Sequence, residues 1–341
     1  MDGVDHAPRA AEGRPSVSVL ALCGGLLAVL ASARLFTNGL EWFGRRSGMA
    51  HAALGTVFAA LGTALPEASI AVLAAVGLGR ASTGDAVSIG AILGAPLLLS
   101  TLGFALLGVG SLRRGGRTLA VDGAALQRDL ALFLLTFGAA TACGLLGAGR
   151  FLRAAVGLAL VGGYLLFVVR VLARSGVEDA AAADPGPLLF ARRSTASWRA
   201  IGVQLAAAMV VMLGGAELFV HTLSGLAVQL GMSGFVLSAL VAPLATELPE
   251  TVNSLVWTSQ GKDTLAAANV TGAMVLQGAV IPAVGMWFTP WKFSGSEDLA
   301  ALVALAAAAG VLIVFRCTGR LQPWVLVAAG GLYVAFAMRV L

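Results

Sequence analysis

Apolar residues in this chain fall into long runs that short polar segments separate. About ten of these runs hold roughly 20 residues with little or no charge, and a helix needs that length to cross a hydrocarbon core of about 30 Å. The runs cover residues 17–38, 48–77, 84–110, 127–147, 151–173, 199–223, 232–258, 264–288, 298–315 and 321–339. The pattern therefore predicts an all-α membrane protein with about ten transmembrane helices.

Composition and charge agree with a membrane protein. Of the 341 residues, 58% are hydrophobic and 11% are charged, whereas soluble domains carry roughly 25% charged residues. The net charge of +5 does not indicate a nucleic-acid partner, because the basic residues cluster in short loops between the apolar runs. Lys and Arg are more frequent on one side, which predicts that both termini lie outside and that residues 174–198 lie in the cytoplasm. The Gly-, Ala- and Arg-rich composition favours a multi-pass protein of a prokaryotic inner membrane, with the lipid bilayer as its partner.

An internal repeat divides the chain into two halves. Residues 33–67 match residues 216–250 without a gap at an offset of 183, and the run Leu-x-Thr-x-Leu-Pro-Glu ends both segments. The match resumes between residues 85–95 and 263–273 at an offset of 178. Five helices per half is an odd number, so the second half enters the membrane from the opposite side, as in secondary transporters with inverted repeats. In each half we expect a helix broken at a Pro-Glu pair, followed by a glycine-bearing helix.

The predicted organisation has four parts. Residues 1–16 form a polar N-terminal tail, residues 17–173 the first five-helix repeat, residues 174–198 a cytoplasmic linker, and residues 199–341 the second five-helix repeat. The linker contains Pro185, Pro187 and the pair Arg192-Arg193, a composition typical of a loop.

Each half places a glutamate inside an apolar helix, Glu67 after Pro66 and Glu250 after Pro249. A charged group near the bilayer centre costs about 2.5 to 3.5 kcal/mol, so such a residue indicates a functional site. Proline lacks an N–H, which frees carbonyl groups one turn earlier in the helix. Ca2+ binds six to eight oxygens of carboxylates, carbonyls and hydroxyls. The two segments therefore predict a cation site between the halves.

Four further side chains belong to the predicted cation site. Thr63 and Thr246 precede the two glutamates by four residues and share their helical faces. Asn269 offers an amide oxygen from the following helix, and Glu247, three residues before Glu250, offers a third carboxylate.

Three close carboxylates repel one another unless they bind metal or are partly protonated, so the set is compatible with proton coupling. Two alternatives remain open. Glu247 could lie in the wall of a solvated vestibule, or the intramembrane glutamates could be protonated and only link helices through hydrogen bonds.

The sequence resembles the cation/Ca2+ exchanger superfamily, which includes Na+/Ca2+ exchangers. Each repeat of that family has a G-T-S-L-P-E type segment and then a G-N-x-x-G-S-N type segment. Residues 61–67 (LGTALPE) and 244–250 (LATELPE) look like the first, and residues 90–96 (GAILGAP) and 268–274 (ANVTGAM) look like the second. The resemblance covers essentially all of the transmembrane chain.

The resemblance implies a fold of two inverted five-helix repeats and a set of functional residues. Glu67 and Glu250 would bind the transported cations, Thr63 and Thr246 would flank them, and Asn269 would sit at the centre. The first and sixth helices would slide as a gate across a fixed core. Arg34 and Glu217 occupy equivalent positions in these two helices, where they either pair or, as we favour, each extend toward a membrane surface.

The sequence also departs from the family motifs. Ala64 and Glu247 replace the serine after the threonine, Ala91 replaces the first asparagine, and Ala95-Pro96 and Ala273-Met274 replace the later serines and asparagines. These lost oxygens are the kind that hold small monovalent ions. H+ is therefore an alternative to Na+ as the coupling ion.

The predicted function is secondary active antiport, in which Ca2+ or another divalent cation exchanges for Na+ or H+ by alternating access. Inorganic cations are the expected ligands, and no cofactor and no enzymatic activity are expected. One alternative is a divergent homologue that moves another cation with H+ coupling. An intramembrane hydrolase with paired acids is less favoured because no motif such as H-E-x-x-H is present. A non-transporting membrane protein would not need the duplicated acidic pair.

Overall fold

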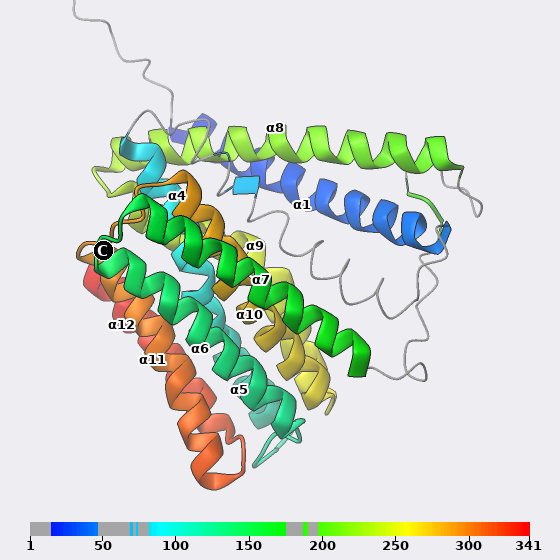
Figure 1. Cartoon of the computed structure of the whole chain (residues 1–341), viewed down its shortest axis with the longest axis vertical. Coiled ribbons are helices and arrows are strands. Elements are labelled where there is room, and N and C mark those ends of the chain that lie inside the picture. Colours follow the sequence, from blue (N-terminus) through cyan, green and yellow to red (C-terminus); the bar gives the residue numbers. More distant parts are fainter. Residues whose placement is uncertain (1–14, 47–68, 71–72, 74–81, 175–186, 190–196) are drawn as a thin grey trace, which may run out of the picture.

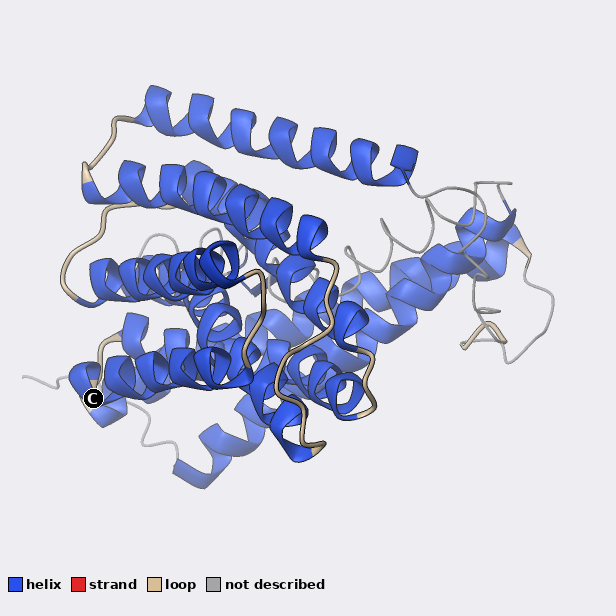
Figure 2. Cartoon of the chain, turned by 90° about the horizontal axis from the view of Figure 1, so that it is seen from below, coloured by secondary structure: helices blue, strands red, loops and turns tan. Residues whose placement is uncertain are grey.

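The structure is a computed structural model that describes residues 15–46, 69–70, 73, 82–174, 187–189 and 197–341. Within these ranges the chain is helical apart from its turns and loops and a few isolated bridge residues, which include the pair Leu119 and Leu321 (Figure 2). The helices are α1 (Pro15–Arg46), α4 (Ser82–Leu98), α5 (Phe104–Arg113), α6 (Gly123–Leu145), α7 (Arg150–Arg174), α8 (Trp198–Leu230), α9 (Gly234–Ser259), α10 (Asp263–Phe288), α11 (Ser296–Thr318) and α12 (Pro323–Val340), with a π-helical turn, Leu99–Gly103, between α4 and α5.

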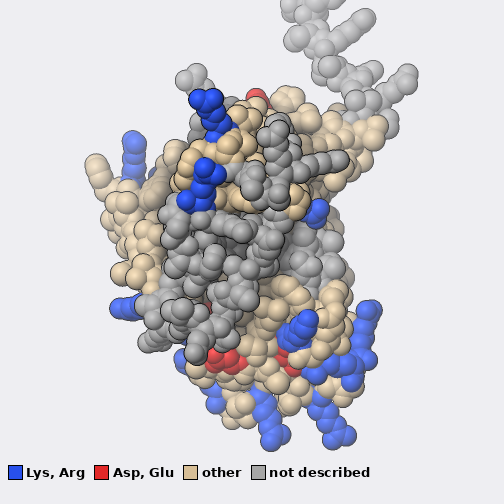
Figure 3. Space-filling model, turned by 90° about the vertical axis from the view of Figure 1, so that its right-hand side faces the viewer, with Lys and Arg blue, Asp and Glu red and all other residues tan. Residues whose placement is uncertain are grey.

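The helices follow the apolar runs of the sequence. In the described part of the chain, eight helical segments are long and apolar enough to cross a membrane, so the all-α membrane architecture is confirmed. The predicted span at residues 48–77 lies almost entirely outside the described residues. On the face drawn in Figure 3, the Lys and Arg side chains lie mainly toward the two ends of the molecule, as expected when the middle lies in lipid.

Residues 82–113 form one continuous helical segment that is interrupted only by the π-helical turn. Pro96 lies inside α4 and cannot donate a backbone hydrogen bond. The π-helical turn follows within three residues, and the hydroxyl of Thr101 donates to the carbonyl of Leu97. The predicted run 84–110 is therefore one span that accommodates its proline without ending.

Two long helices, α1 and α8, lie side by side along one edge of the molecule (Figure 1). They approach most closely where Gly25 faces Gly215, because a Cβ atom on Gly25 would lie 2.8 Å from the carbonyl oxygen of Gly215. Gly39 faces Leu205 further along, so the two helices run antiparallel. At the Gly39 end, the amide of Gln204 donates to the carbonyl of Leu35 and to Oδ1 of Asn38, at 2.8 and 3.0 Å.

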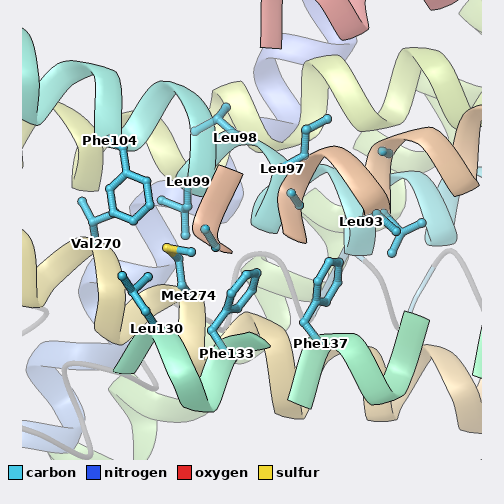
Figure 4. Packing of buried hydrophobic residues seen from close by; sticks show 14 of the residues in the cluster. Leu93, Leu97, Leu98, Leu99, Phe104, Leu130, Phe133, Phe137, Val270 and Met274 are labelled. Atoms are coloured by element: carbon cyan, nitrogen blue, oxygen red, sulfur yellow. The ribbon is translucent and has the colours of Figure 1, made fainter. Parts of the chain in front are cut away.

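The interior of the remaining helices is apolar and closely packed. Phe133 and Phe137 of α6 are fully buried and stack with 5.2 Å between their ring centroids. Their side chains point toward α4 and α10, with Met274 beside Phe133 (Figure 4). Gly278 makes room for Phe133, since a Cβ there would lie 2.7 Å from that ring. This core fixes α10 against α6.

Close contact between α4 and α9 joins the two halves of the chain. Added Cβ atoms on Gly90 and Gly94 would lie 2.5 and 2.4 Å from the carbonyl oxygens of Phe235 and Ala239. Ser238 completes the contact with a 2.7 Å hydrogen bond to the carbonyl of Val87. The glycines of the segment GAILGAP therefore let two backbones approach closely.

Candidate cation site

The predicted site residues of the second half lie on a hairpin of two helices, α9 and α10. Gly231, with φ of 63°, ends α8, and the Ser233 side chain caps α9 by accepting from the N–H of Val236.

A turn at Gln260–Lys262, with Gly261 at φ of 80°, reverses the chain into α10. Asp263 opens α10 and pairs with Arg114, and it also accepts from the N–H of Ala120 at 2.8 Å. The turn sets the register of α10 against α9, and the Asp263 contacts join the start of α10 to the segment between α5 and α6.

Two polar contacts cross the hairpin. Asn269 Nδ2 donates to Ser254 Oγ at 3.0 Å, and Gln277 Nε2 donates to Glu247 Oε1 at 2.5 Å. Seven residues separate the two contacts on α9 and eight on α10, which corresponds to about 11 Å of helix. The position of Glu250 lies between them on α9.

Glu247 is buried inside the protein. Its exposure is 2%, and that of Gln277 is 3%. Oε2 of Glu247 has no hydrogen-bond partner among the described residues, and neither of the two ion pairs resolved there includes Glu247. The vestibule-wall alternative for this residue is therefore wrong. A buried carboxylate without a cation is costly, so this carboxyl group is stable either protonated or bound to a cation.

The neighbouring hydroxyls on α9 bond to their own helix. Thr246, which is buried, donates to the carbonyl of Ala242 at 3.2 Å, and Thr251 donates to the carbonyl of Glu247 at 3.0 Å. These bonds use the proton of each hydroxyl, and a hydroxyl oxygen that donates in this way is also of a type that accepts hydrogen bonds or binds cations.

The structure places the predicted site residues unequally. Thr246, Glu247 and Asn269 lie on the hairpin as described above. Glu250 belongs to α9, on the helical face of Thr246 and Ser254, but its side chain is outside the described part. Thr63 and Glu67 lie entirely outside the described residues.

The expected break at Pro249 does not occur. Residues 234–259 form one continuous helix that includes Pro249. A proline removes one hydrogen bond and bends a helix, but the helix resumes when the neighbouring turns remain bonded. The prediction of a broken second-half helix was therefore wrong at the level of secondary structure.

Sequence reasoning did not find Gln277, Ser254 or Thr251. Gln277 lies in a strongly apolar helix eight residues after Asn269, and an amide at such a place signals a polar partner. The partner itself could be identified only from the register of the hairpin.

A second polar cluster lies on the opposite side of α10. Asp129 of α6 accepts from Thr271 at 3.0 Å and from Arg128 Nη2 at 2.8 Å. This carboxylate has a cationic partner and Glu247 has none among the described residues, so the two buried acids differ in their chemistry. Within the described ranges, no three His, Cys, Asp or Glu side chains gather as a metal-binding group.

Comparisons with known proteins agree with this architecture. A family model described as "Sodium/calcium exchanger protein" matches residues 17–173 and 201–341. The putative antiporter CaxA of Alkalimonas amylolytica is 25% identical over 323 residues, which covers 90% of this chain and 92% of CaxA.

Solved structures share the fold. The H+/Ca2+ exchanger CAX superposes with a TM-score of 0.74 at 16% identity, covering 94% of this chain and 82% of the other. The sodium-calcium exchanger NCX_Mj superposes with a TM-score of 0.56 at 22% identity, covering 96% and 99%. Native YfkE gives a TM-score of 0.68 at 15% identity, covering 95% and 96%. The predicted exchanger-like helical fold is confirmed.

Proposed function

The chain belongs to the sodium/calcium exchanger protein family, and we propose that it exchanges Ca2+ for H+, with Glu247 as a group that binds each ion in turn. Family membership makes it a secondary cation antiporter and not an enzyme. The observation that carries the choice of H+ is the burial of Glu247 beside a neutral amide, without a cationic partner among the described residues.

Proton binding at Glu247 follows from the cost of a buried charge. When no metal is bound, the carboxyl group keeps its proton because the ionised form would be desolvated. When Ca2+ enters, the metal replaces the proton and neutralises the carboxylate. Gln277 stays bonded to Oε1 in both states, which leaves Oε2 for the proton or the metal.

The proposed Ca2+ ligands come from both repeats. Glu67 and Glu250 supply the shared carboxylates, Thr63 and Thr246 supply oxygens one turn earlier, and Asn269 supplies an amide oxygen. Glu247 stands where the family motif has a serine, so it adds a negative charge at a position that is neutral in that motif. A third carboxylate favours binding of a divalent cation, and the same carboxylate can bind a proton when the cation leaves.

Access to the site would alternate through movement of α1 and α8 against the rest. Both helices meet the core along an apolar seam, where Val220 and Leu223 of α8 pack with Val87 of α4 and Leu237 of α9. The seam lacks directional bonds among these side chains, so the α1–α8 pair can shift along it at low cost. The proposed location is a prokaryotic inner membrane with both termini outside.

The test is gradient-driven flux in liposomes. Purified protein would be reconstituted, and 45Ca2+ uptake would be measured under an imposed pH gradient, an imposed Na+ gradient, or neither. Uptake driven by the pH gradient, and lost in Glu67→Gln and Glu250→Gln, supports the proposal. Uptake driven only by Na+ would overturn H+ coupling, and uptake unaffected by both substitutions would overturn the assigned site.

A further inference from the structure

One face of α8 points away from the rest of the molecule. Residues on this outward face recur every three or four positions and are all exposed: Val210, Gly214, Glu217, His221, Gly225 and Val228. The opposite face, which includes Met212 and Phe219, is buried against α1 and the core. The helix itself lies along the edge of the molecule (Figure 1).

The internal repeat gives the depth of this face in the membrane. When the offset of 183 is extended toward the start of α1, Val29 corresponds to Met212. Both residues are fully buried, and both lie at the crossing of α1 and α8 near the Gly25–Gly215 contact. Inverted repeats are related by an axis in the membrane plane, so this crossing is at mid-depth. Glu217 is five residues from Met212, or about 7.5 Å along the helix. It therefore lies within a hydrocarbon half-thickness of about 15 Å.

Glu217 has no partner within reach among the described residues of its own copy. Arg34, its equivalent in the repeat, is five residues beyond the crossing in the other direction, so about 15 Å of helix separates the two. No hydrogen bond or ion pair resolved among the described residues includes Glu217 or His221. A glutamate side chain is also too short to reach the membrane surface from that depth, in contrast to a long Arg side chain. Extension toward the membrane surface therefore does not account for Glu217 at this inferred depth.

We propose that the outward face of α8 binds a second copy of this chain, with Glu217 of each copy paired to His221 of the other. The two residues are one turn apart on the same face, so a two-fold axis near them makes two identical acid–imidazole contacts. An added Cβ on Gly214 or Gly225 would meet nothing within 4 Å, and small residues at these flanking positions let two helices approach closely. A carboxyl group and an imidazole on one face complement the same two groups on another copy, which favours an identical partner.

Energy transfer between fluorescently labelled copies in lipid vesicles, measured at increasing dilution in lipid, tests this interface. The wild type is expected to dimerise. The single substitutions Glu217→His and His221→Glu should each raise the dimer dissociation constant about tenfold or more, since each removes two interhelical contacts within the membrane. The double variant with both exchanges restores the complementary pairs and should return to within about threefold of the wild type. Gly214→Trp should prevent association.

The matched control is Leu158→Trp on α7, a 66% exposed residue on another outward face. It should leave the dissociation constant unchanged. The proposal is overturned if the wild type shows no transfer above that of random mixing, if Gly214→Trp acts no more strongly than Leu158→Trp, or if the double exchange fails to recover. These readouts do not depend on the transported ion or on activity.

Discussion

Gln277 of α10 donates its side-chain amide to the carboxylate of Glu247 in α9, across 2.5 Å in a fully buried setting. The amide of Gln277 is neutral, so the contact positions the carboxyl group of Glu247 without neutralising its charge. This differs from Asp129, whose buried carboxylate pairs with Arg128. The distinction gives Glu247 its proposed role in proton exchange.

Replacing Glu247 with glutamine should remove proton coupling, because the amide keeps the shape of the protonated acid and cannot release a proton. The substitution removes the charge with which the Glu247 carboxylate would bind the cation. A charge-assisted contact of this kind is worth about 1.5 to 3 kcal/mol, which corresponds to a change of roughly ten- to a hundredfold in an equilibrium constant. We expect pH-driven 45Ca2+ uptake to fall by that factor. Uptake would be measured across a series of external pH values. Glu247→Ser, which introduces the hydroxyl of the family motif, should likewise shift the pH dependence or the cation preference.

Asp129→Asn provides the matched control for the loss of a buried carboxylate. It changes a paired acid on the other side of α10 and should leave the shape of the pH profile unaltered. An identical pH profile in Glu247→Gln and the wild type would show that Glu247 is only part of the protein wall.

Gln277→Leu should both lower the stability of the protein and alter the pH profile of 45Ca2+ uptake. The substitution keeps the approximate size of the side chain and leaves Oε1 of Glu247 without its donor, at a cost of about 1 to 3 kcal/mol. Thermal unfolding in detergent and the pH dependence of 45Ca2+ uptake are the two measurements. Met274→Leu, a buried substitution on the same helix, is the control and should change neither the unfolding temperature nor the pH profile strongly. If Gln277 has only a structural role, Gln277→Leu will lower the unfolding temperature and leave the pH profile unchanged.

Gly94→Ala should destabilise the contact between the two halves. The added Cβ would lie 2.4 Å from the carbonyl oxygen of Ala239, and overpacking of this kind costs about 1 to 3 kcal/mol. The fraction of monodisperse protein that survives heating would report the loss. Gly163→Ala on α7 is the control, because a Cβ there would meet nothing within 4 Å, and it should be tolerated. Equal thermal stability of the two variants would contradict the packing argument.

Asp263→Ala should be more damaging than Asp263→Asn. Asp263 is buried and joins the start of α10 to Arg114 and to the N–H of Ala120. The asparagine still accepts from that N–H, whereas alanine leaves it unpaired, a further loss of about 1 to 3 kcal/mol. Thermal unfolding in detergent measures the difference, and equal stability of the two variants would show that the Ala120 contact contributes little.

Hydrophobic length and internal symmetry predicted most of the described fold. The helices α6, α7, α11 and α12 end within a few residues of their apolar runs, because lipid demands helices of that length. The partner of Glu247 could not be predicted, because Gln277 is 30 residues away and the pairing depends on the register that the Gln260–Lys262 turn sets. The behaviour of Pro249 was also missed, since a motif does not reveal whether the surrounding turns hold a helix together.

The most direct test of proton exchange at Glu247 follows both ions in the same vesicles. Liposomes that contain a pH-sensitive dye and the purified protein would receive an inward Ca2+ gradient, and 45Ca2+ entry and internal pH would be recorded together. The account predicts that Ca2+ entry drives H+ out in the wild type and that this proton movement disappears in Glu247→Gln. Ca2+ entry without proton movement in the wild type, or unchanged proton movement in Glu247→Gln, would contradict it.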